Sequence, residues 1–255
     1  MLFSWRKKMI TSQWQGKKVA FLGDSITDKI HVGTEKNYWQ YLEEKLGITP
    51  LVYGINGNRW LDTKPQAEKL FAEHGTDIDA IFIFMGTNDY MGAIMPGEWY
   101  SFQMEETNHG GNMVKRLRRH LNLDEETFCG RINAAMSYLK ETFPYQQIVL
   151  MTPIHRAFAT FSPTNVQPEE SFANAIGLYV ESYVEKIRQA ADIWSCPLID
   201  LYRTSGLYPL TESHGVFFAN PETDRLHPGT AGHARIAQTM LYQMLTLPAT
   251  FRDIR

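Results

Sequence analysis

The stretch VAFLGDSITD, residues 19–28, decides the fold. Four apolar residues end abruptly in glycine, aspartate and serine, which is typical of a buried strand that runs into a tight turn. In a parallel α/β sheet both faces are buried, so strands are continuous apolar runs and ligands bind beyond their carboxyl ends. We therefore expect a strand at 19–22 and functional groups in the turn that follows.

Further apolar runs predict a mainly parallel sheet of five strands. The other four runs are LVY (51–53), DAIFIFM (79–85), QIVLMT (147–152) and PLIDLY (197–202). Segments with helical spacing separate them and predict helices at 37–46, 64–74, 124–143, 168–191 and 236–245. The helix at 124–143 is expected to have Asp124 as its N-cap and to stop at Pro144. This alternation is typical of an α/β protein, and we expect a single domain over residues 1–255.

Composition excludes several classes of protein. The chain is 44% hydrophobic and 21% charged, with 18 Gly and 12 Pro, which fits a folded globular domain. A net charge of −3 makes nucleic acid a poor partner. Two cysteines, Cys129 and Cys196, are too few for a disulfide scaffold, and the sequence leaves open whether they pair. The usual metal, nucleotide and dinucleotide motifs are missing, so no cofactor or metal is predicted.

The sequence predicts no membrane span. It has no run of about 18 apolar residues, and residues 1–18 lack the apolar segment of about 7–15 residues that a signal peptide needs. For the chain as it stands we expect a cytoplasmic location, or a secreted or periplasmic one if a leader has been removed. The oligomeric state stays open.

The segment 90–123 is the irregular part of the pattern. It places 34 residues between a strand and a predicted helix, where connections of about 4–6 residues are usual. We expect an insertion that forms a lid or a substrate wall. Within it, MVKRLRRHL (113–121) predicts a basic helix, for which a solvated face is a more frequent role than a phosphate site.

Four polar blocks carry the functional interpretation. GDSITD (23–28), GINGN (54–58) and GTND (86–89) follow three of the apolar runs, and DRLHPG (224–229) precedes the last helix. In this order the blocks resemble the SGNH, or GDSL-type, family of esterases and lipases, from Lys18 to the last helix and excluding the insertion. The resemblance implies a three-layer α/β/α sandwich with a flavodoxin-like sheet, and serine-dependent ester hydrolysis without a cofactor.

The resemblance places the family's catalytic residues on Ser25, Gly57, Asn88 and His227. The chemistry agrees, because a serine hydroxyl is a poor nucleophile unless a base such as imidazole accepts its proton. Among eight histidines, His227 stands out because Asp224 precedes it by three residues and can fold back onto Nδ1. The alternative interpretations are that the GDSITD and DRLHPG blocks each provide a helix N-cap and that His227 is there incidentally.

Acyl transfer also needs hydrogen-bond donors at the oxygen that gains negative charge. By resemblance, the N–H groups of Ser25 and Gly57 and the side-chain amide of Asn88 form this oxyanion hole. Gly54 is a rival, but the family's functional glycine tends to be the later one, followed by a polar residue. A turn glycine and a turn-capping asparagine are the alternatives. Asp89 is expected to be structural.

Aromatic residues near the blocks suggest the substrate. Trp60 follows the glycine block, Tyr90 and Trp99 lie in the insertion, and His155 follows the fourth strand. Aromatic faces suit sugar rings as well as acyl chains, although these rings could equally pack the insertion. Because the family often deacetylates carbohydrates, a small or oligosaccharide O-acetyl ester is the favoured substrate. The alternatives are a lipase, thioesterase or arylesterase, and a non-catalytic carbohydrate-binding protein.

Overall fold

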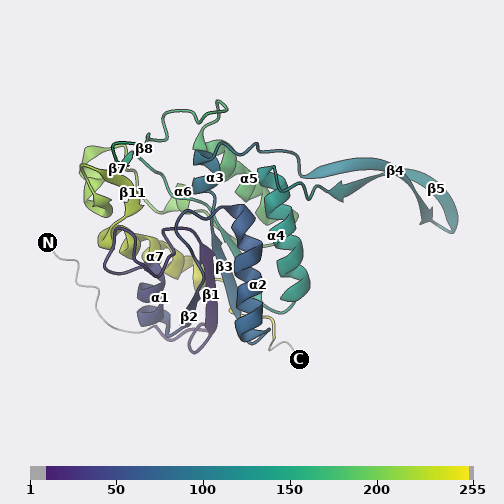
Figure 1. Cartoon of the computed structure of the whole chain (residues 1–255). Coiled ribbons are helices and arrows are strands. Elements are labelled where there is room, and N and C mark those ends of the chain that lie inside the picture. The colour runs from purple at the N-terminus through teal and green to yellow at the C-terminus, as the bar shows by residue number, and fades with distance from the viewer. Residues whose placement is uncertain (1–9, 253–255) are drawn as a thin grey trace.

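A five-stranded parallel sheet runs through the middle of the protein (Figure 1). The computed structural model describes residues 10–252. We predict no signal peptide in residues 1–18, and the first half of that stretch, residues 1–9, lies outside the described residues. In spatial order the strands are β2 (Thr49–Val52), β1 (Lys18–Gly23), β3 (Ala80–Phe84), β6 (Gln147–Met151) and β9 (Leu198–Ile199). All neighbours are parallel, and the order confirms the predicted flavodoxin-like sheet.

Successive strand residues feed two cores, because their side chains point to opposite faces of the sheet. Leu22, Ile83 and their neighbours pack against α2 (Thr63–His74), α4 (Phe128–Thr142) and α5 (Val180–Ile193). Phe21 and Phe84 pack on the opposite face against α1 (Tyr38–Leu46) and α7 (Thr230–Met244). Helices therefore cover both faces, and the predicted three-layer α/β/α sandwich is confirmed.

Two predicted element boundaries at Asp residues are wrong. The N-cap of α4 is Thr127, whose Oγ1 accepts the N–H of Gly130 at 3.2 Å, because the chain turns between Asp124 and Thr127 before the helix begins. The strand predicted at 197–202 ends after Ile199. Asp200 caps the short helix α6 (Leu201–Thr204) by accepting the N–H of Arg203.

The helix predicted at 168–191 begins only at Val180. In residues 171–179, Asn174 Oδ1 accepts the N–H groups of Ile176 and Leu178 at 3.2 and 3.0 Å. An asparagine side chain that bonds the local backbone competes with helical hydrogen bonds, so this segment stays irregular.

The sequence does not predict a second, antiparallel sheet of four short strands. Its order is β10 (Phe218–Asn220), β11 (Asp224–Pro228), β7 (Ala159–Ser162) and β8 (Asn165–Gln167). β11 holds the DRLHPG block, which the sequence presents as a loop. It becomes a strand because it pairs with β10 on one side and β7 on the other.

Residues 100–121 form a β-hairpin, not the predicted basic helix, and we call this hairpin the arm. β4 (Tyr100–His109) pairs with β5 (Asn112–Leu121) over their full lengths. Gly110 and Gly111 both have positive φ, +59° and +84°, which is the geometry of a two-residue hairpin turn. Figure 1 shows the arm projecting away from the body. Within a single chain it does not cover the strand ends, and its role as a lid or substrate wall stays a prediction.

Both cysteines are buried and unpaired. Burial raises the pKa of the Cys129 thiol to about 11, so this group stays protonated near neutral pH. Between residues 10 and 252, no helix is both long enough and apolar enough to cross a membrane.

Candidate active site

A sharp turn after β1 brings Ser25 to the carboxyl end of the strand. Asp24 shapes the turn, because its Oδ1 accepts the N–H of Ile26 at 3.1 Å and its backbone oxygen accepts that of Thr27 at 3.0 Å. Gly23 leaves room for this turn, since a Cβ there would lie 2.8 Å from Thr27 Cβ. Ser25 is consequently fixed at the sheet edge and is 8% exposed.

Ser25, His227 and Asp224 form one chain of hydrogen bonds, although 202 residues separate Ser25 from His227. His227 Nε2 lies 3.0 Å from Ser25 Oγ, and its Nδ1 lies 2.9 Å from Asp224 Oδ2. The second carboxylate oxygen of Asp224 accepts the backbone N–H of His227 at 2.9 Å. The structure thus brings together the three residues that the sequence singles out.

The charge of Asp224 fixes the tautomer of His227. Burial opposes ionisation of Asp224, but hydrogen bonds from His227 and the backbone outweigh it and lower the Asp224 pKa. An ionised carboxylate can only accept, so Nδ1 of His227 donates to it and Nε2 accepts the hydroxyl hydrogen of Ser25. A serine in this position can pass its proton to the ring as it attacks a carbonyl.

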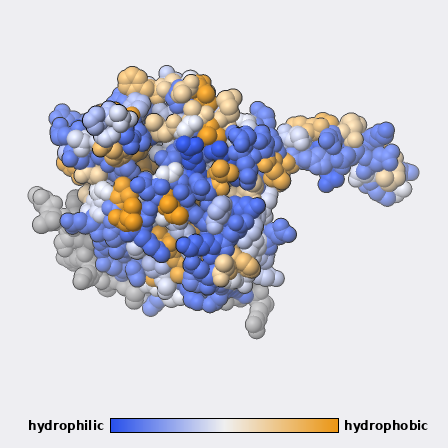
Figure 2. All heavy atoms as spheres, in the orientation of Figure 1, coloured by the Kyte–Doolittle hydropathy of each residue, from blue (hydrophilic) through white to orange (hydrophobic). Residues whose placement is uncertain are grey.

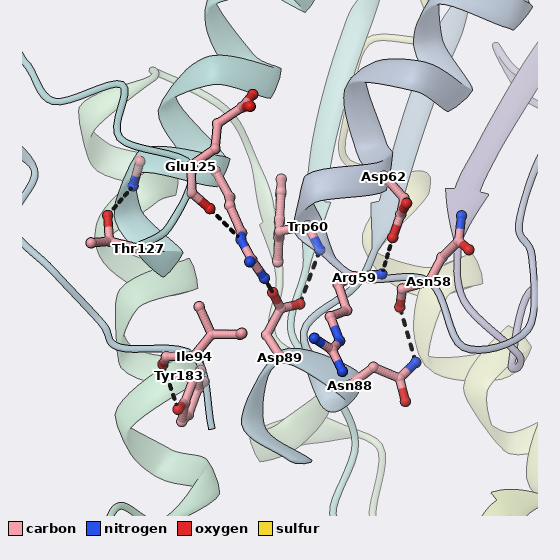
Figure 3. Close-up of polar contacts among 12 residues, drawn as sticks. Asn58, Arg59, Trp60, Asp62, Asn88, Asp89, Ile94, Glu125, Thr127 and Tyr183 are labelled. Carbon is pink, nitrogen blue, oxygen red and sulfur yellow. Dashed lines mark hydrogen bonds and ion pairs between the residues drawn. The ribbon is translucent and has the colours of Figure 1, made fainter. Parts of the chain in front are cut away.

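Asn58 of the glycine block and Asn88 of the GTND block lie side by side (Figure 3). Asn88 Nδ2 donates to Asn58 O at 2.9 Å, which leaves the second amide hydrogen for a ligand. Asp28 Oδ2 accepts the N–H of Asn56 at 2.7 Å and so ties the glycine block to the serine block. Gly57 is exposed with φ +83°, and a Cβ there would meet nothing within 4 Å.

Gly54, the rival of Gly57, has a packing role. A Cβ at Gly54 would lie 2.6 Å from Cβ of Thr27, so the glycine lets the two blocks approach closely. This leaves Gly57 as the open backbone position of the block, and its place in an oxyanion hole stays a prediction.

Asp89 joins three elements behind the site (Figure 3). It lies in α3 (Thr87–Met91) and is fully buried. Its carboxylate accepts the N–H of Trp60 at 2.9 Å and Nη1 of Arg131 at 3.1 Å. Arg131 in turn donates from Nε to Glu125 O at 2.7 Å. The expected structural role of Asp89 is therefore confirmed: it ties α3 to the turn after the glycine block and to α4.

Three aromatic residues predicted to line the substrate are packed in the interior instead. Trp60 is 0% exposed and Tyr90 is 1% exposed, with its hydroxyl donating to Phe172 O at 2.7 Å. Trp99 is 8% exposed, and its Nε1 donates to Gln189 Oε1 on α5 at 2.9 Å. The prediction is wrong for all three, because aromatic patterning does not separate rings that pack an insertion from rings that face a ligand.

His155 keeps a place near the surface. It is partly exposed, its Nδ1 lies 2.5 Å from Glu170 Oε1, and its ring centroid is 3.7 Å from that of Tyr202. Its predicted role in lining the substrate stays a prediction.

Phe161 is a residue that sequence reasoning missed. Its ring centroid lies 5.6 Å from that of His227, and the side chain is 45% exposed. Only the pairing of β7 with β11 brings the two rings together. The aromatic residues of AFATF (157–161) are the one local signal that could have predicted the strand.

A cavity of about 580 Å³ opens on the other side of the glycine block, between the end of β2 and α2. Gly54, Ile55 and Asn58 of the glycine block contribute to its lining. The rest of its lining mixes polar and apolar groups: Asp28, Lys29, Val52, Tyr53, Asp62, Pro65, Gln66, Lys69 and Glu73. In the described part of the chain, no three His, Cys, Asp or Glu side chains are placed to hold a metal ion.

The fold and site together define an ester-hydrolysing enzyme built on a flavodoxin-like sheet. The model of the GDSL-like lipase/acylhydrolase family matches residues 21–235, and the chain belongs to this family. The resemblance drawn from the four blocks is thereby confirmed, and membership implies small ester substrates.

Solved structures share the fold. A protein of Lactobacillus plantarum has a TM-score of 0.69 at 23% identity, covering 90% of this chain and 97% of its own. A possible lipase from Chitinophaga pinensis has a TM-score of 0.65 at 20% identity, covering 90% and 98%. A catalytic mutant of an acetylxylan esterase from Geobacillus stearothermophilus has a TM-score of 0.53 at 21% identity, covering 93% and 96%. No curated protein matches the chain.

Proposed function

We propose that the chain is a serine esterase that works through an acyl-enzyme. The observation that carries the proposal is the hydrogen-bonded chain from Ser25 through His227 to Asp224. His227 Nε2 takes the hydroxyl proton as Ser25 Oγ attacks the ester carbonyl carbon. The N–H groups of Ser25 and Gly57 and the free amide hydrogen of Asn88 then donate to the oxyanion.

The second half of the cycle returns the proton. The carbonyl carbon releases the alcohol, which leaves with the proton from His227, and the acyl group remains on Ser25. Water then attacks the acyl carbon and gives a proton to His227, and Ser25 recovers that proton as the acid leaves. The Asp224 carboxylate stabilises the imidazolium in both halves.

The favoured substrate is a short-chain ester, above all an acetyl ester, of a carbohydrate. The cavity beside the glycine block carries several charged and amide side chains, which can hydrogen-bond sugar hydroxyls. Two structural neighbours are acetylxylan esterases by name, although they share only the fold with this chain. A lipase, thioesterase or arylesterase is the second candidate.

Hydrolysis of p-nitrophenyl acetate tests the mechanism. We expect Ser25→Ala to lower kcat by about 10³-fold or more, since the nucleophile is lost. Ser213→Ala, which changes an exposed serine, is the matched control and should keep full activity. Equal rates for wild type and Ser25→Ala would sink the serine mechanism. Absence of turnover in both would favour the carbohydrate-binding alternative.

Comparison of substrates tests the acyl preference. Acetylated xylo-oligosaccharides and p-nitrophenyl esters of increasing chain length are compared by kcat/KM. We expect acetyl esters to be hydrolysed fastest and the rate to fall as the chain lengthens. A rate that rises with the length of the acyl group would make this protein a lipase.

A further inference from the structure

The arm has two unlike faces. Residues directly opposite each other in an antiparallel pair share a face, so the register assigns every side chain. One face, which we call the apolar face, carries Tyr100, Phe102, Met104, Met113, Leu117 and Leu121, interrupted by Glu106, Lys115, Asn108 and Arg119. Figure 2 shows hydrophobic residues along the upper edge of the arm. The other face is almost wholly polar.

The apolar face is open to solvent in a single chain. Phe102, Met104, Met113 and Leu117 are 59%, 62%, 63% and 64% exposed. β4 and β5 pair only with each other, and a lone two-stranded hairpin is at best marginally stable in water. Large apolar side chains that cluster at the surface mark an interaction site, so we expect another surface to cover this face.

We propose that a second copy of this chain covers the apolar face, each copy lending its arm to the other. Residues 100–121 hold four Lys or Arg and two Glu, a net charge of +2, whereas the remaining 21 Lys or Arg and 26 Asp or Glu give −5. The arm is therefore attracted to the body of another copy. The same negative body is repelled by an anionic membrane, the other surface that a basic, apolar hairpin suits.

The dimensions of the arm require the exchange to run in both directions. Ten residues at about 3.4 Å each and a width of about 10 Å give one face an area of about 340 Å². A stable interface covers about 800 Å² on each partner, so one docked arm falls short. Two-fold exchange, in which each copy gives an arm and receives one, gives about 680 Å² per partner, which lies within the usual range of about 600–1,000 Å².

The acceptor surface is the irregular segment 171–179. Its apolar side chains are exposed: Phe172 by 60%, Tyr179 by 50% and Ile176 by 38%. Glu169 and Glu181 flank it in sequence and provide acidic partners for a basic arm. An apolar segment flanked by acids thus matches an apolar face that also carries Lys115 and Arg119.

This segment also lies beside the candidate active site. Tyr90 donates from its hydroxyl to Phe172 O at 2.7 Å, and Asn174 Nδ2 donates to Tyr90 O at 3.0 Å. Tyr90 belongs to α3, the helix that carries Asn88. A docked arm would therefore form a wall next to the partner's strand ends. This is the predicted role of a substrate wall, which the arm does not fill within its own chain.

Sedimentation equilibrium of the full-length chain tests the proposal. We expect a particle of twice the 29.4 kDa chain mass, and a dimer Kd raised at least about 100-fold by the triple variant Phe102→Ser, Met104→Ser, Leu117→Ser. The matched control changes the polar face through Gln103→Ser, Thr107→Ser and His109→Ser and should leave the dimer intact. Hydrolysis of p-nitrophenyl acetate and circular dichroism check that the body of each variant is folded.

The other outcomes each overturn part or all of the proposal. A wild type that stays monomeric at high micromolar concentration, or a triple variant that still dimerises, overturns the exchange of arms. A dimer that survives Phe172→Ser with Tyr179→Ser overturns the acceptor surface. A monomeric wild type could instead sediment with phosphatidylcholine vesicles that contain about 30% phosphatidylserine. If the triple variant does not sediment with them, the arm binds membranes and not a second copy.

Discussion

Asp224 holds His227 at two points, through the ring nitrogen and through the backbone N–H. In Asp224→Asn the side chain can donate as well as accept, so the ring can adopt the tautomer in which Nε2 carries the hydrogen and cannot accept from Ser25. We expect kcat to fall about 10²–10⁴-fold with little change in KM. Steady-state hydrolysis of p-nitrophenyl acetate measures this, with exposed Asp192→Asn as the control. An unchanged kcat would contradict the assigned role of the carboxylate.

His233 gives the fold a dependence on pH that does not involve catalysis. The ring is fully buried in α7, and its Nδ1 accepts the N–H of Tyr38 at 3.2 Å. Burial, with a smaller contribution from His227, lowers the pKa of His233 to about 3. The unfolded chain binds a proton on this ring below about pH 6.5 and the folded chain only near pH 3, so stability is lost as pH falls through this window.

The matching experiment follows urea unfolding of wild type and His233→Asn between neutral and acidic pH. The stability of wild type should fall relative to the variant as pH decreases, because only wild type has this proton to take up on unfolding. His109→Asn, a change of an exposed histidine on the arm, should track wild type at every pH. Parallel curves for wild type and His233→Asn would show that the buried ring has no such effect.

At the scale of elements, a buried ion pair fastens α4 behind the site. Arg131 and Asp89 have side chains that are 7% and 0% exposed, at 3.1 Å. Arg131→Met leaves the carboxylate buried without its partner, and we expect a loss of about 3–5 kcal/mol in the free energy of unfolding. The double variant Arg131→Met with Asp89→Asn has no unpaired buried charge, and we expect it to recover most of the lost free energy of unfolding.

Chemical denaturation of the four chains of this double-mutant cycle measures the coupling. Arg203→Met is the control, since its side chain is 75% exposed and it should cost no more than about 1 kcal/mol. A double variant no more stable than Arg131→Met alone would mean that packing of the arginine stem, not its charge, stabilises α4.

The elements that the sequence predicts well are those whose pattern comes from burial on both faces. β1, β3 and β6 lie within one residue of their predicted bounds because each is a continuous apolar run. The helix predicted at 113–121 is wrong for a physical reason: Met113, Leu117 and Leu121 recur every four residues, which places them on one face of a helix and equally on one face of a strand. Only Gly110-Gly111 distinguishes the two.

At the scale of the whole molecule, the site also has residues that the local sequence predicts and residues that it does not. Ser25, His227 and Asp224 could be singled out because each sits in a local block with its own chemistry, and the parallel sheet brings such blocks to one edge. Phe161 could not, since it reaches His227 only through the distant pairing of β7 with β11. Contacts made by long-range pairing leave little trace in local sequence, and aromatic residues such as Trp60 look alike whether buried or exposed.

Removal of the arm separates the chemistry from the choice of substrate. Residues 102–119 contribute to neither core and can be replaced by Gly-Gly. We expect kcat/KM for p-nitrophenyl acetate to stay within about threefold of wild type, because the hydrogen-bonded chain at Ser25 lies wholly in the body. For acetylated xylo-oligosaccharides, KM should rise about tenfold with kcat kept, since a wall contacts the bulky alcohol and not the reacting atoms. Equal losses of kcat/KM on both substrates would show that the arm supports the fold of the body. No loss on either substrate would show that the arm does not take part in substrate binding.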